Sequence, residues 1–181
     1  MHRPDVPPGV AVNPARQAAD ASSVTERYRV PKLRVPAEIR TSAVAARPVF
    51  LFLNPSAEGH AGRERPSDLL NFGGHFLVVE DESGEIEFLN RDGTLTVTVA
   101  AELEGAIPTG APASACRVAV VLHDGSTLEG EVRYQLPEAQ RRLQDYLNAD
   151  ELFLPVRCDD GRVCLVNKRG VVRVVARSGE E

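Results

Sequence analysis

The chain has 181 residues, of which 43% are hydrophobic, 5% are aromatic and none is Trp, so its core must consist mostly of Val, Leu and Ala. It contains no run of about 18 apolar residues and no apolar leader at its N-terminus, and we therefore expect a cytoplasmic protein without a membrane partner. Three cysteines without a CxxC spacing argue against a disulfide framework and a structural zinc site.

The chain begins with a basic arm. Residues 1–47 carry eight Lys/Arg and four Asp/Glu, whereas residues 48–181 carry 13 and 22 and form an acidic body. The positive charges of the arm are spread out, which favours contact with the acidic body of its own chain or of a neighbouring copy over nucleic acid. Residues 1–27 are predicted to be disordered because they bury little apolar surface. Residues 28–47 contain Arg-Val-Pro twice, and we expect an extended edge strand or strap there, docked on its own chain or on a partner.

An internal repeat follows the arm. Residues 68–99 align without a gap with residues 145–176, which lie 77 positions later, and 10 of the 32 positions are identical. Chance would give roughly one identity in twenty positions, so we interpret the repeat as a duplication. The identical pairs are Asp68/Asp145, Leu70/Leu147, Asn71/Asn148, Phe76/Phe153, Leu77/Leu154, Val79/Val156, Gly84/Gly161, Asn90/Asn167, Gly93/Gly170 and Val97/Val174.

The repeat divides the body into two units. Residues 48–100 form the first repeat unit and residues 117–177 form the second, and each starts with an apolar run that we take as its first strand. Residues 101–116, rich in Ala, Gly and Pro, are predicted to be a linker, and residues 178–181 are a short tail.

Each unit is predicted to combine several strands with one short helix. Helices are expected at residues 66–71 and 137–148, where Pro occupies the first turn. A Phe-Leu-x-Val strand, a polar turn, a second strand, an Asn-x-x-Gly turn and a closing strand follow in each unit. The predicted fold class is therefore mainly β with short helices, a β-rich α+β protein whose two units pack as a pseudo-two-fold pair.

Two stretches of the second unit show a characteristic order of strands and glycines. Val118–Gly125, with Gly130 five residues later, consists of a strand, an acidic-Gly turn and a second strand; Val166–Val172 consists of a strand, an Arg-Gly turn and a closing strand. These stretches resemble the two sequence signatures of Sm-like small β-barrels, which have an SH3-like architecture. The resemblance implies a strongly bent barrel of five strands in each unit and a family role in RNA binding.

The resemblance also implies a binding site, because the Arg of the Arg-Gly turn contributes to the base-binding pocket in that family. The corresponding ligand-binding or RNA-binding residues in this sequence are Asn167, Lys168, Arg169 and Gly170. A structural role is open as well, with Gly allowing a positive φ between two strands and Asn capping the bend.

Four polar positions recur in the repeat, namely Asp68, Asn71, Asp145 and Asn148. They allow two quasi-equivalent polar sites, but a structural role is favoured. The Asn residues would end the helices in the left-handed conformation, and the Asp residues would accept hydrogen bonds from nearby backbone amides.

The sequence contains no catalytic or metal-binding motif. His123-Asp124 precedes Gly-Ser at a strand end, where Asp-Gly is ordinary hairpin chemistry. His60 and His75 have no second ligand at a suitable spacing. We therefore expect no enzymatic activity, no cofactor and no metal.

These observations favour a non-enzymatic regulatory or protein-interaction module that binds a protein partner or associates with itself. The alternative is an Sm-like RNA-binding protein, which the acidic body disfavours. A third interpretation is a small-molecule or enzymatic site assembled from dispersed residues, which a single sequence does not reveal.

Overall fold

The computed structural model describes residues 31–105, 114–135 and 142–177. The predicted disordered arm at 1–27 and the tail at 178–181 lie outside the described residues. The first half of the described chain contains β1 (Leu33–Thr41), β2 (Arg47–Leu53), α2 (Pro66–Phe72), β3 (Phe76–Glu80), β4 (Ile86–Asn90), β5 (Thr94–Ala100) and α3 (Ala101–Glu104). The second half contains β6 (Ser114–Leu122), β7 (Thr127–Tyr134), α4 (Leu143–Leu147), β8 (Phe153–Arg157), β9 (Arg162–Asn167), the 3-10 helix η2 (Lys168–Gly170) and β10 (Val171–Arg177).

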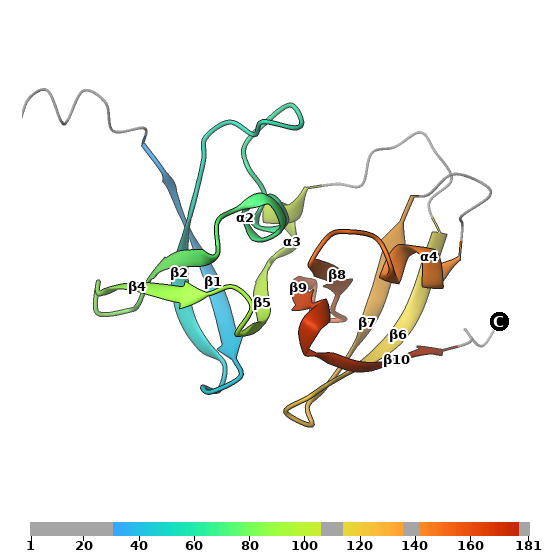
Figure 1. The fold of residues 1–181 in the computed structure, drawn as a ribbon. Helices are drawn as coiled ribbons and strands as arrows, with labels where there is room; N and C mark the ends of the chain where they lie inside the picture. Colours follow the sequence, from blue (N-terminus) through green and yellow to red (C-terminus); the bar gives the residue numbers. More distant parts are fainter. Residues whose placement is uncertain (1–30, 106–113, 136–141, 178–181) are drawn as a thin grey trace, which may run out of the picture. The chain divides into compact units, whose positions relative to one another are not determined.

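The strands form a single antiparallel sheet, which confirms the prediction of a mainly β protein with short helices. The strand order is β10-β6-β7-β8-β9-β5-β1-β2-β3-β4 (Figure 1). The order within the first half is β5-β1-β2-β3-β4, and the second half has the same order in its own strands. Neither half closes on itself, because β4 does not pair with β5 and β9 does not pair with β10. The sheet is therefore open where two separate barrels were expected.

The pairing that joins the halves differs from the predicted pseudo-two-fold arrangement. A two-fold axis would bring equivalent strands together. The halves are joined instead by β5, the fifth strand of the first half, and β9, the fourth strand of the second half. The junction is therefore head-to-tail.

The Pro-containing segment is an inner strand rather than the expected edge strand. β1 pairs with β2 along Leu33 to Ile39 and with β5 from Glu38 onward. Pro36 consequently has a strand neighbour on one side only, opposite Phe50, and a proline is tolerated at such a locally unpaired position of a strand. β1 has the place beside β5 that β6 has beside β10, so the first strand of the first half precedes the apolar run at residues 48–53.

The core consists of two apolar clusters, and one of them is built from both halves. The first joins residues of β1, β2, β3, β5 and α2 to Phe153, Val163 and Leu165 of the second half. The second cluster is formed mainly by β6 to β9 and also contains Leu95 of β5. The two halves therefore share their buried surface.

The helices are short and lie near the predicted positions. α2 covers residues 66–72, and α4 covers residues 143–147 of the predicted helix at 137–148. Residues 137–141 of that prediction are outside the described chain. No helix among the described residues is long and apolar enough to cross a bilayer.

Gly130 allows β7 and β8 to approach each other closely. A Cβ atom at this position would lie 2.4 Å from the Arg157 carbonyl oxygen and 2.7 Å from Val156 Cγ1. We predict that Gly130→Ala lowers the free energy of unfolding by about 1–3 kcal/mol because strand backbone must move. Urea unfolding followed by circular dichroism measures the loss. Gly74→Ala is the matched control, since nothing lies within 4 Å of the added atom; an equal effect of both substitutions would contradict the steric explanation.

Candidate functional site

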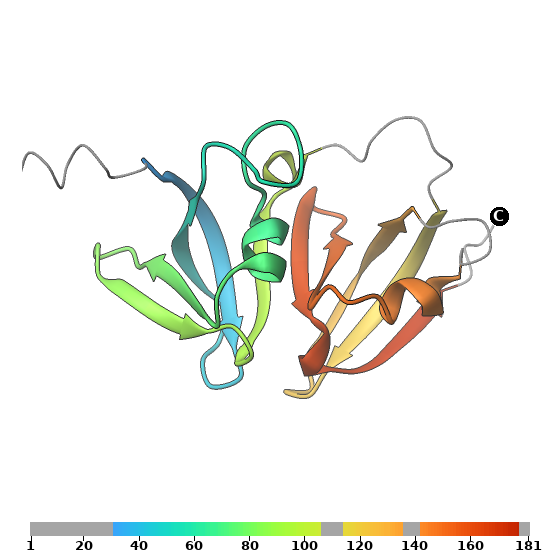
Figure 2. The same ribbon diagram turned by 45° about the horizontal axis from the view of Figure 1, so that its top comes forward.

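The two halves meet where β5 pairs with β9, and we call this junction the seam (Figure 2). Val97 lies opposite Leu165, and Val99 lies opposite Val163. All four side chains are at most 2% exposed, as is Phe153 of the neighbouring strand β8. The β8–β9 hairpin is thus buried on both faces, with one face against its own half and the other against the first half.

Asn71 of α2 holds the start of β8 at the seam. Its side chain accepts a hydrogen bond from the Phe153 amide at 2.8 Å and donates one to the Phe153 carbonyl at 3.5 Å. An Asn side chain that binds both groups of one residue imitates the pairing of a neighbouring strand. The hydrogen bonding of the sheet therefore continues from β8 to the side chain of Asn71 on α2.

Asn167 of β9 is fully buried and binds the turn before β5. Its Nδ2 group donates to the carbonyl oxygens of Arg91, Asp92 and Thr94 at 3.1, 3.4 and 2.8 Å. Its Oδ1 atom accepts a hydrogen bond from the Arg169 amide at 2.9 Å. One buried side chain thus satisfies backbone groups of both halves, which would otherwise be costly to bury.

Lys168 is used within the second half. Its Nζ atom donates to the carbonyls of Leu147 and Ala149 at the end of α4, and burial lowers the pKa of its ammonium group. Its counterpart Arg91 likewise donates to the Gly73 carbonyl after α2, at 2.7 Å. Each cation therefore satisfies carbonyls at a helix C-terminus, where positive charge is favoured.

Arg169 and Gly170 also have structural contacts. Arg169 forms an ion pair with Asp92 across the seam. The predicted positive φ is wrong for Gly170 and for Gly93, because neither has one. A Cβ atom on Gly170 would instead lie 2.7 Å from Leu95 Cδ2, so the glycine is explained by close packing. The four predicted binding residues thus lie at the end of β9 beside the seam, where the side chains of Asn167, Lys168 and Arg169 contact other groups of the protein.

The repeated polar residues contact backbone groups. Asp68 and Asp145 each accept a hydrogen bond from the amide three positions earlier, at 2.9 and 3.3 Å. The expected left-handed helix ends are wrong. Asn148 has φ −93° at the end of α4, and Asn71 lies inside α2 because the helix continues to Phe72.

His60 and Asp68 form a polar pair beside a cavity of about 550 Å³. His60 Nε2 lies 2.7 Å from Asp68 Oδ2, which also accepts the Arg65 amide. Glu64, another cavity residue, accepts a hydrogen bond from the Asn54 amide at 2.6 Å. The carboxylates of Asp68 and Glu64 thus form hydrogen bonds with residues of the loop before α2. This structural role accounts for their positions without a bound ligand. Among the described residues, no three His, Cys, Asp or Glu side chains gather as a metal site would require.

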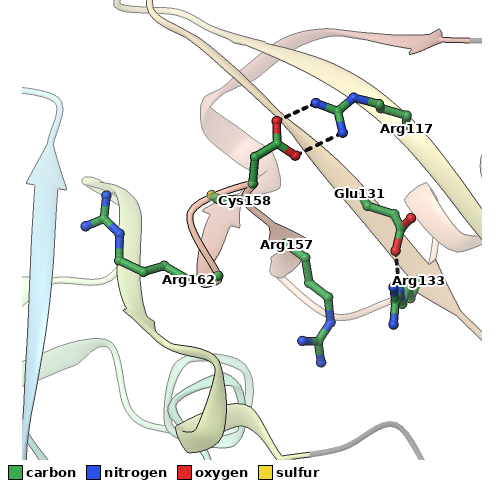
Figure 3. A pocket seen from close by; sticks show the side chains of 8 residues that line it. Arg117, Glu131, Arg133, Arg157, Cys158 and Arg162 are labelled. Atoms are coloured by element: carbon green, nitrogen blue, oxygen red, sulfur yellow. Dashed lines mark hydrogen bonds and ion pairs between the residues drawn. The ribbon is translucent and has the colours of Figure 1, made fainter.

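A second cavity, of about 300 Å³, has four arginines in its wall (Figure 3). Three are paired with carboxylates: Arg117 with Asp159, Arg133 with Glu131, and Arg162 with Asp160. The fourth, Arg157, reaches the Gly105 carbonyl at 3.5 Å. Burial raises the pKa of the neighbouring Cys158 thiol, so a reactive thiolate is disfavoured. The positive charges are largely compensated, and the cavity provides no strong anion site.

The strongest candidate site is an apolar surface on β3 and β4. Phe76, Val78, Ile86 and Phe88 are 60%, 38%, 47% and 67% exposed. They lie on one side of the hairpin, where Val78 is opposite Phe88, while the alternate residues of β3 face the core. We call these four residues the apolar face. Sequence analysis did not single them out, because a run such as Phe76–Val79 is equally typical of a strand buried on both sides.

Comparison of the chain with protein-family models, with curated proteins and with solved structures finds no match.

The central role of Asn167 predicts a large loss of stability on its removal. We expect Asn167→Ala to lower the free energy of unfolding by about 2–4 kcal/mol, since the buried Thr94 carbonyl and the half-buried Arg91 carbonyl lose their donor. Asn90→Ala is the matched control, because Asn90 is the exposed counterpart and its side chain accepts the Asp92 amide next to it. We expect a loss below about 1 kcal/mol for this control. Similar losses in chemical denaturation would show that the seam does not depend on Asn167.

The surroundings of His60 lead us to expect that the stability of the protein depends on pH. The pKa of His60 is raised above 6.5 by the hydrogen bond to the Ala61 carbonyl and by the bond to Asp68. Because the folded-state pKa is the higher one, the stabilisation is fully present below pH 6.5 and is lost as the pH rises through the folded-state pKa. NMR titration should show the raised pKa in the wild type and a lower one in Asp68→Asn. His60→Gln should lower stability more under mildly acidic than under mildly alkaline conditions, and the reverse order would contradict the assignment.

Proposed function

We propose that this protein is a non-enzymatic protein-interaction module that binds its partner through the apolar face of β3 and β4. The observation that carries the proposal is the exposure of this face. Four of the eight large apolar side chains that are exposed in the described residues gather there. Contiguous exposed apolar surface marks sites of protein association.

The strand at this end of the sheet supports the same function. β4 pairs with β3 and has no second neighbour among the described strands. Its sequence, Ile-Glu-Phe-Leu-Asn, contains neither the Lys nor the Pro that commonly protects an edge strand. A partner that adds a strand to β4 would gain backbone hydrogen bonds and would also cover Ile86 and Phe88.

The polar parts of the structure offer less for binding or catalysis. Lys168 and Arg169 are engaged by helix carbonyls and by Asp92, so RNA binding through this turn draws little support. The carboxylates beside His60 and the arginines around Cys158 are largely paired with protein groups. Small-molecule binding and catalysis are therefore weaker alternatives.

A relation between the two halves is part of the proposal. Residues 77 positions apart lie in corresponding strands, and the two halves have the same strand order. This agreement supports an origin by duplication of an Sm-like unit of five strands. In this interpretation each unit remains open, and the β8–β9 hairpin of one packs against the other.

Photo-crosslinking in the source cells tests the proposed surface. A photoreactive amino acid in place of Phe88 should form an adduct with a discrete protein, since a bound partner would cover this side chain. The same amino acid in place of Val44, which is 52% exposed in the turn between β1 and β2, is the matched control. The Phe88 adduct should disappear when Phe76→Ser is added. No adduct at Phe88, or the same adduct at both positions, would refute the proposed surface.

A further inference from the structure

The sheet has two free ends, and they differ from each other. β4 lies at one end and β10 at the other, each with one neighbour among the described strands. Counting 77 positions along the chain, β4 corresponds to β9 and β10 corresponds to β5. These counterparts are the two strands that pair at the seam. Each free edge is therefore the counterpart of one member of a pair that already exists inside the chain.

The apolar face corresponds to the surface that the seam buries. Phe76, Ile86 and Phe88 are 60%, 47% and 67% exposed. Their counterparts are Phe153, Val163 and Leu165, which are at most 1% exposed and pack against the first half. The same side of the hairpin is thus covered in the second half and uncovered in the first.

At the other free end, no hairpin of the described residues packs in the corresponding place. In the first half, Leu70, Val97 and Val99 are buried by the hairpin that packs on them. Their counterparts are Leu147, Val174 and Ala176. Leu147 and Val174 are half-buried, and Ala176 is exposed. An apolar hairpin on β10 and α4 would complete this second cluster as β8–β9 completes the first.

The polar groups that hold the seam also have counterparts at the free ends. Asn71, which binds the Phe153 backbone, corresponds to the exposed Asn148 at the end of α4. Asn167, which binds the turn before β5, corresponds to the exposed Asn90 at the end of β4.

We infer that the partner of the apolar face is a second copy of this chain, which docks β10 and α4 against β4 and repeats the seam between molecules. This inference rests on the proposed function and identifies the partner. The seam register places Val174 of one copy opposite Phe88 of the other, and Ala176 opposite Ile86. Asn148 would bind the Phe76 backbone of the other copy.

The charges of the two edges are complementary. β10 carries Arg173 and Arg177 and no acidic residue, whereas β4 carries Glu87 and no basic residue; Glu87 also pairs with Arg47, and Arg177 with the exposed Glu129. In the seam register Arg177 lies opposite Glu85, the residue that precedes β4. Opposite charges across a strand pair are favourable, whereas two β4 edges would bring like charges together.

This association is head-to-tail, so a dimer still carries one free edge of each kind. Successive copies then form a closed ring or an open chain, depending on the rotation between neighbours. Blocking either edge of every copy removes all contacts, and two differently blocked copies retain a single compatible pair of edges.

Analytical ultracentrifugation of the purified full chain tests the inference, because single blocked variants and their mixture should differ in mass. The wild type should form species of at least twice the monomer mass as its concentration rises. Phe88→Glu and Ala176→Glu should each remain monomeric, because each places a charge at an apolar contact. Both side chains are exposed, so circular dichroism should show unchanged folding. Val44→Glu is the control and should associate like the wild type. An equimolar mixture of the two blocked variants should form a dimer and nothing larger.

The possible results separate this inference from the proposed function. A wild type that stays monomeric at all concentrations would overturn docking of a second copy, while a Phe88 adduct with another protein would leave the proposed function intact. Association that persists in Phe88→Glu would show that copies meet elsewhere. A mixture that remains monomeric although the wild type associates would rule out the head-to-tail pairing.

Discussion

The structure depends on the pairing of β5 with β9, because this seam closes the core of the first half with residues of the second. Val97 and Val99 of β5 are buried together with Val163 and Leu165 of β9. Removing β9 would expose the first cluster along a whole strand. At roughly 25 cal/mol for each Å² of apolar surface, such exposure would cost several kcal/mol. The two halves therefore stabilise each other through the buried surface that they share.

The seam also explains why similar hairpins have different surroundings. The β8–β9 hairpin is covered on both faces, whereas the β3–β4 hairpin is covered on one. Apolar residues nevertheless occupy both faces of each hairpin. Three of the six phenylalanines in the chain, Phe72, Phe76 and Phe88, remain largely exposed. Burial of an aromatic side chain is strongly favourable. Two of these three phenylalanines, Phe76 and Phe88, lie on the β3–β4 hairpin, so covering this hairpin would bury the most aromatic surface.

Much of the strand content could be predicted from the sequence, because the apolar runs and the Gly-containing turns are local signals. The strands after each helix and the turns between them lie where the repeat places them. Contacts between distant segments were harder to predict. Pro36 suggested an edge strand, yet β1 is an inner strand that has a free side only near this proline. Gly170 suggested a left-handed turn, but its small size is needed beside Leu95.

The candidate site escaped prediction for a related reason. Exposure of Phe88 and burial of Leu165 follow from the strand that lies beside each hairpin, and the residues themselves do not encode that neighbour. Conversely, the polar motif at Asn167–Gly170 resembled a binding turn because buried structural asparagines and ligand-binding asparagines use the same hydrogen-bonding groups. Only the fold shows whether such an asparagine is buried against backbone groups or open to a ligand, and this distinguishes the structural role from the binding role.

Register limits what can bind to a sheet edge such as β4. A shift by one residue would turn every apolar side chain of an added strand to the opposite face. At the seam the register is fixed at both ends of β9: the β5 ladder pairs Ala100 with Arg162, and Asn167 binds the turn before Thr94. Asn90 stands at the end of β4 in the place that Asn167 has at the end of β9. A strand added to β4 and flanked by a turn with free carbonyls would meet this amide in one register only, so turn geometry as well as apolar contact would restrict which strand fits this edge.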